Sequence, residues 1–136
     1  MSYGMAAALQ KAVYLRLVAD EVLDGLIGGA IHDALPPGLP PPLYVALGPE
    51  KVRERSDASG RGAEHDFTVI VVTESAGFAR AKEAAAAVSD ALLGADLILE
   101  RGRVVLLDFL QARALRAGVG DERRIEMSFR ALIEDN

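Results

Sequence analysis

Two His-Asp dipeptides, His32-Asp33 and His65-Asp66, carry the residue types in this sequence that could do chemistry. Imidazole and carboxylate groups are the usual ligands of catalytic metal ions. One hypothesis is therefore a small metal-dependent hydrolase that uses His32, His65 and Asp66. Since successive side chains of a strand point to opposite faces, His65 and Asp66 would diverge if they open a strand. A metal site would then need His32 and further carboxylates to lie close to either His65 or Asp66.

Other catalytic arrangements have less support. Ser59 or Ser75 could be combined with His65 and Asp66, but the sequence has no Gly-x-Ser-x-Gly elbow to hold a nucleophile. The absence of cysteine excludes disulfides, thiolate metal sites and a cysteine nucleophile. The glycine pairs at 60–62 and 118–120 are typical of turns, because neither joins a strand to a helix. We therefore predict no catalytic, cofactor-binding or metal-binding residue, and no enzymatic activity.

The composition is that of a globular protein. The 136 residues suit one domain, expected to span 1–136, with 51% apolar and 26% charged residues. With 5% aromatic residues and no tryptophan, the core must be built from Leu, Val, Ile and Ala. The net charge of −5 disfavours non-specific binding of nucleic acid. No targeting segment is expected, and no apolar run approaches the ~20 residues of a membrane span.

The first half of the chain predicts a helix, a proline segment and a strand. Apolar residues recur at helical spacing over 4–26, and Gly28-Gly29 supplies a stop. Five of the six prolines fall in 31–48, which excludes helix and central strand there. We expect an extended surface segment, preceded by a short edge strand over 31–35. Residues 43–47 are expected to form the start of a strand.

The second half predicts three strands and one helix. Residues 50–62 are charged and small, and we expect a long mobile hairpin loop. Residues 65–73 form a central strand, and residues 76–93 a helix with Ser75 as N-cap and Gly94 at its end. Residues 103–115 and 123–133 form a long hairpin. The order α-β-β-α-β-β predicts an α+β fold: a mostly antiparallel four-stranded sheet with two helices packed on one face.

Arginines cluster at 53–61 and again from 101 to 130, despite the acidic total. One interpretation is a solvated sheet face with Arg–Glu pairs, which contribute little stability. Another is a subunit interface or a surface that faces nucleic acid. Guanidinium groups make bidentate contacts at interfaces, and we favour the interface largely because of the family resemblance described below. The predicted interface residues are Pro40, Pro41, Pro42, Tyr44, Arg53, Arg55, Arg61, Arg113, Arg116, Arg123, Arg124, Glu126 and Arg130.

Residues 31–36 and 42–48 resemble a signature of phage tail-completion, or tail-terminator, proteins, which are encoded in the head–tail connector clusters of long-tailed phages and of bacterial gene transfer agents. The central strand at 65–72, the alanine-rich helix at 77–93 and the strands at 102–109 and 130–134 are similar to the same family. The family often has a tryptophan after the central strand, where this chain has Val72-Thr73-Glu74.

The resemblance implies a structural protein of a phage-like particle, either a gene transfer agent or a siphophage. Such proteins form a ring, typically a hexamer, that terminates the tail tube and joins it to the head or neck. The implied partners are further copies of the chain, the tail tube protein and the neck or head-completion protein. DNA passes through the lumen without specific binding, no cofactor is needed, and assembly takes place in the bacterial cytoplasm.

Pro40-Pro41-Pro42 would then be a docking segment or a rim of the ring. The alternatives are the hydrolase described above and an adaptor of another tail-like bacterial assembly.

Overall fold

The computed structural model describes residues 3–33, 41–55, 62–74, 78–94, 96–116 and 122–135. In chain order the elements are α1 (Ala6–Val18), α2 (Glu21–Ile27), β1 (Ile31–His32), β2 (Leu43–Glu54), β3 (Gly62–Thr73), α3 (Ala79–Leu93), β4 (Arg103–Arg116) and β5 (Arg123–Glu134).

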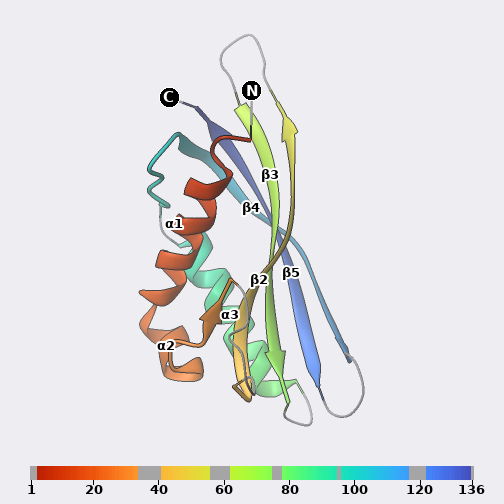
Figure 1. Ribbon diagram of the computed structural model, residues 1–136. Coiled ribbons are helices and arrows are strands. Elements are labelled where there is room, and N and C mark those ends of the chain that lie inside the picture. Colours follow the sequence, from red (N-terminus) through yellow and green to blue (C-terminus); the bar gives the residue numbers. More distant parts are fainter. Residues whose placement is uncertain are drawn as a thin grey trace.

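The strands form one sheet in the order β1-β2-β3-β5-β4, and the helices lie on one side of it (Figure 1). All pairings are antiparallel except the parallel pairing of β1 with β2. The α+β class and the one-sided helix layer are confirmed. The prediction of four strands and two helices is wrong, because the described chain has five strands and three helices.

The predicted helix over 4–26 is wrong in one respect, because it is broken into α1 and α2. Asp20 leaves the helical conformation with φ −78° and ψ 118°, and its carboxylate accepts a hydrogen bond of 2.9 Å from the backbone N–H of Leu23. This is an N-cap, which starts a second helix. The predicted stop is confirmed: Gly28 adopts the left-handed conformation, with φ 61°, that ends α2. The edge strand that follows is shorter than 31–35, since β1 has two residues.

The predicted bounds of the loop over 50–62 are also wrong, because residues 50–54 belong to β2 and Gly62 is the first residue of β3. β2 continues to Glu54, and β3 begins at Gly62, three residues before the predicted start. Val52 pairs with His65 and Arg53 pairs with Glu64 across the two strands. Charged residues at alternate positions thus continue the polar face of a strand. Residues 56–61, where mobility was expected, lie outside the described part of the chain.

Helix α3 begins at Ala79, and the predicted N-cap Ser75 lies outside the described residues. The predicted end at Gly94 is confirmed. The side that faces the protein is made largely of alanine. Its buried residues are Ala81, Ala84, Ala85, Ala87, Val88, Ala91 and Leu92.

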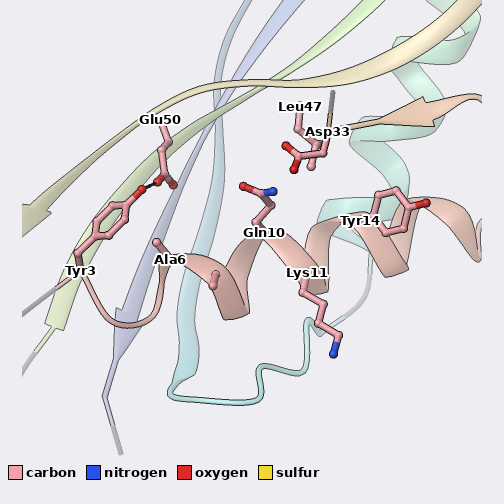
Figure 2. Close-up of a pocket in the computed structure, with 9 residues that line it drawn as sticks. Tyr3, Ala6, Gln10, Lys11, Tyr14, Asp33, Leu47 and Glu50 are labelled. Atoms are coloured by element: carbon pink, nitrogen blue, oxygen red, sulfur yellow. Dashed lines mark hydrogen bonds between the residues drawn. The ribbon is translucent and has the colours of Figure 1, made fainter. Parts of the chain in front are cut away.

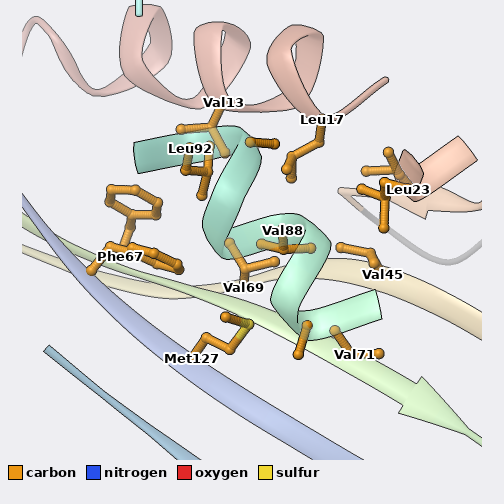
Figure 3. Close-up of a cluster of buried hydrophobic side chains, with 14 of the residues drawn as sticks. Val13, Leu17, Leu23, Val45, Phe67, Val69, Val71, Val88, Leu92 and Met127 are labelled. Atoms are coloured by element: carbon orange, nitrogen blue, oxygen red, sulfur yellow. The ribbon is translucent and has the colours of Figure 1, made fainter. Parts of the chain in front are cut away.

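The core fills the space between the helices and the sheet. Figure 3 shows α3 between α1 and the sheet, with Val88 and Leu92 among Val13 and Leu17 of α1 and Val69 of β3.

Below the helix layer, the Phe129 ring is stacked on Phe67 with centroids 5.5 Å apart and meets the edge of Phe109 at 5.7 Å. These contacts bind β3, β5 and β4 together on the helix side of the sheet.

The predicted C-terminal hairpin is confirmed, with each strand one residue longer than expected. Its turn lies outside the described residues. Burial alternates along β5. Its helix-side residues Ile125, Met127, Phe129, Ala131 and Ile133 are buried, whereas the residues between them are half-buried.

Candidate interaction surface

The sheet face opposite the helices, called here the outer face, carries a network of paired charges. Strand alternation places Glu64 and Asp66 of β3 on this face, because their neighbours Ala63 and Phe67 are in the core. Arg130 of β5 lies directly opposite Asp66 in the β3–β5 register. Acidic and basic side chains of adjacent strands are thus brought within reach of each other.

Glu64 is the centre of this network. Its side chain is 7% exposed, and it accepts hydrogen bonds from Arg53 and, at 3.1 Å, from Arg55. The Arg130 guanidinium lies 3.0 Å from the same carboxylate. A buried carboxylate needs such partners, because removal from water disfavours its charged form. Three arginines therefore converge on one acid of β3: Arg53 of β2, Arg55 directly after β2 and Arg130 of β5.

Asp66 and Arg130 form the adjoining pair. Arg130 donates two hydrogen bonds to the Asp66 carboxylate, at 2.8 and 3.0 Å, in the bidentate geometry that a guanidinium favours. These bonds hold the pKa of Asp66 below its usual value, although partial burial opposes the shift. They also raise the pKa of Arg130. Both groups are therefore ionised over the physiological range.

The ion pairs continue along the β4–β5 hairpin. Arg113 donates to Glu126 at 2.9 Å, and Arg124 lies 3.9 Å from the same carboxylate. At the other end of the hairpin, Arg103 donates to Glu134 at 2.5 Å. The outer face thus matches the predicted solvated face of Arg–Glu pairs. Because the arginines meet carboxylates, it is a mixed-charge surface.

The structure brings together only part of the predicted interface set. Arg53, Arg55 and Arg130 meet at Glu64, while Arg113, Arg124 and Glu126 form a second group. Arg123 lies on the helix side instead, with its guanidinium 5.4 Å from the centre of the Phe78 ring. Arg116 is exposed at the end of β4. Pro40 and Arg61 lie outside the described residues.

The remaining predicted residues lie where the chain enters β2. The Pro42 carbonyl accepts a 3.0 Å hydrogen bond from the backbone N–H of Glu74, which ties this entry to the end of β3. Pro41 is half-buried. Tyr44 is buried, and burial raises the pKa of its phenol. The assignment of the whole set to an interface stays a prediction.

Sequence reasoning missed Glu64, the residue that organises the surface. The signal was present in the alternation of 62–73, which places Glu64 and Asp66 on one face at a spacing of two. It was overlooked because the strand was predicted to start at His65, one residue too late to include Glu64.

The alternative hydrolase site does not assemble. His65 is fully buried on the helix side, while Asp66 lies on the outer face, as the alternation of a strand requires. Burial lowers the pKa of His65, so the imidazole is neutral at pH 7. Within the described ranges, no group of three or more His, Asp or Glu residues is placed to hold a metal ion. In the same ranges, no helix is long and apolar enough to cross a membrane.

A one-sided α+β sheet with a paired-charge outer face fits a structural or binding protein. Comparison with known proteins identifies the class more closely. Residues 11–134 match the family model described as Tail completion protein gp17. The chain belongs to this family, whose members are structural components of phage-like tails and not enzymes. The expected structural role, tail location and lack of enzymatic activity are therefore confirmed.

Among solved structures, the chain is similar to one in the structure titled "Virion of native gene transfer agent (GTA) particle". The two are 58% identical, with a TM-score of 0.92, over 98% of this chain and 99% of the other. A search of the curated proteins gave no match.

Proposed function

We propose that this chain forms a closed ring, typically a hexamer, that terminates the tail tube of a gene transfer agent particle and joins it to the head or neck. The observation that carries the proposal is the 58% identity over nearly the whole chain to a component of a gene transfer agent virion. At this identity and coverage, residues 1–136 are expected to act as one domain with the same place in the particle.

The charge distribution supports a passive role toward DNA. The chain has a net charge of −5, and the outer-face arginines are engaged by Glu64, Asp66, Glu126 and Glu134. Phosphate binding would require these arginines to leave carboxylate partners. DNA can therefore pass through the lumen without being held by this face. The other partners are the tail tube protein and the neck or head-completion protein.

The proposal is tested by deleting the gene in a producing strain and examining the particles by electron microscopy. The expected result is tails of uncontrolled length, or tails that fail to join heads, with normal particles restored by the intact gene. Light scattering after size-exclusion chromatography measures the oligomer, alone and with added tail tube. A strictly monomeric protein that is absent from purified particles would refute the proposal.

A further inference from the structure

The strand at one edge of the sheet, β4, carries an unusual amount of exposed apolar surface. Val105, Leu106, Phe109 and Leu110 are each 41–54% exposed and lie within six consecutive residues. We call these four residues the β4 strip. Val105 and Leu110 fall at the two register shifts of the β4–β5 ladder, where β4 has no partner residue on β5. Edge strands of soluble proteins usually avoid such surface, because it invites another chain to pair.

Among the residues that the structure describes, the opposite edge of the sheet is also open. β1 covers only Val45 and Ala46 of β2, and no other strand in the described ranges pairs with β2 on that side. The stretch of β2 from Leu47 to Glu54 therefore presents backbone groups that a further strand could use.

A cleft of about 480 Å³ lies beside this stretch, between β2 and α1 (Figure 2). We call it the β2-edge cleft. Its lining residues are Tyr3, Ala6, Ala7, Gln10, Lys11, Tyr14, Asp33, Leu47 and Glu50.

The cleft continues the line of β1. Asp33 directly follows β1 and lines the cleft, so a strand placed there would lie next to β1 along the same edge of β2. The wall on α1 includes two small side chains, Ala6 and Ala7, which leave room for larger ones. Figure 2 shows the Lys11 ammonium group turned away from β2. The site therefore combines an open strand edge with a wall that could accept apolar side chains.

The directions of the strands make the two edges compatible. Going across the sheet from β2 to β3, β5 and β4, each step is antiparallel, so β2 and β4 run in opposite directions. A neighbouring copy related by rotation about an axis along the strands keeps its strand directions. Its β2 would then lie antiparallel to the first copy's β4, the ordinary hairpin-like pairing. Contacts between two different edges repeat around a ring, as closed cyclic oligomers require.

We propose that β4 of one copy adds to the β2 edge of a second copy. Phe109, which lies on the helix side of the sheet, then packs over the β2-edge cleft, while Leu106 lies on the outer face of the extended sheet. A second copy is the occupant that fits, because the apolar edge strand β4 and the β2 edge belong to the same chain, lie at opposite ends of its sheet and run in opposite directions. Pro49 has no N–H and so contributes no donor to this pairing. The proposal deepens the proposed function, because it rests on the ring and names its subunit contact.

Because the chain has no cysteine, engineered thiols test the contact cleanly. L110C and A7C are purified separately and oxidised alone and as a mixture. The expected product is a disulfide-linked dimer in the mixture only, and a ladder of linked oligomers for the double variant L110C/A7C. The matched control is A86C, an exposed alanine on α3, mixed with L110C. Equal linkage with A86C, or efficient linkage of L110C alone through a two-fold β4–β4 contact, would overturn the proposal.

A second variant separates the contact from the ring itself. L110D should abolish ring formation without lowering the melting temperature, while V22D, at an exposed apolar residue of α2, should leave rings intact. Rings that survive L110D and give no L110C–A7C disulfide would refute this contact but leave the proposed function standing. A chain that forms no ring and is absent from particles would refute both.

Discussion

Replacing Glu64 with glutamine should lower the free energy of unfolding by about 1–2 kcal/mol. A hydrogen bond to a charged group contributes roughly 1.5–3 kcal/mol when its partners are buried. Here the acceptor is buried but its arginines are not: the Arg53 and Arg55 side chains are 45% and 64% exposed, so water recovers part of the loss. Glutamine keeps the shape of the side chain and removes the charge on which three arginines converge.

Glu126 provides the matched control, since it is also a glutamate on the outer face with two arginines near it. Its side chain is 27% exposed and its pair with Arg113 is open to solvent, so Glu126→Gln should cost less than about 0.5 kcal/mol. Urea denaturation of the monomeric chain measures both. In about 1 M salt, where the screening length is ~3 Å, the effect of Glu126→Gln should vanish and that of Glu64→Gln should persist.

A double-mutant cycle identifies the source of the effect. If Glu64 acts through Arg130, the variant Glu64→Gln/Arg130→Met is less destabilised than the sum of its parts, while Glu64→Gln with Arg113→Met is additive. The reasoning is refuted if Glu64→Gln costs no more than Glu126→Gln, or if both cycles are additive.

Three further predictions concern single residues. Because burial lowers the pKa of His65, the unfolded chain binds more protons below about pH 6.5, and stability should fall as the pH drops from 7 to 5, by at most ~1.4 kcal/mol per pH unit. His65→Leu should weaken the dependence of the free energy of unfolding on pH, measured by denaturation at several pH values. An unchanged dependence would show that other titratable groups cause it. Gly102→Ala should destabilise by about 1–3 kcal/mol, because φ is 79° and a Cβ would lie 2.6 Å from a backbone oxygen. Gly25→Ala, with open space around the glycine, should stabilise the fold by up to ~1 kcal/mol. Thermal melts measure both variants, and equal changes in stability for Gly102→Ala and Gly25→Ala would contradict the steric argument. Asp20→Ala should cost about 0.5–2 kcal/mol through loss of the α2 cap, and hydrogen exchange should show the faster opening in α2; no change there would exclude a capping role.

The sequence predicted the elements in which one face is buried and the other is not. The last strand, around Phe129, and the helix that contains Val88 were both predicted, because burial imposes a period that the local sequence records. Asp20 was misread for the opposite reason. On an amphipathic helix an aspartate belongs to the polar face, and only the backbone angles distinguish a cap from a solvated side chain.

The end of β2 and the centre of the outer face were missed for one shared reason. Arg53 and Arg55 look like loop residues when their segment is read alone. Arg53 lies in β2 and Arg55 directly follows it, and Glu64 of the next strand supplies a partner for both. Likewise, nothing in the local sequence indicates that β3 pairs with β5 instead of β4. Register and strand order are properties of pairs of segments, which local periodicity does not contain.

The alanine side of α3 has a consequence for how this chain can change over time. Positions such as Ala81 and Ala84 have no exposed surface and lie in the layer between the sheet and the other helices. There a larger side chain would be rejected for its volume, however apolar it is. In a comprehensive mutational survey, α3 should therefore tolerate serine or glycine better than leucine at these positions, the reverse of an ordinary core. At the buried positions of this helix, substitution is limited by the volume of the new side chain. Its solvent-facing positions, such as Ala86, are free to vary.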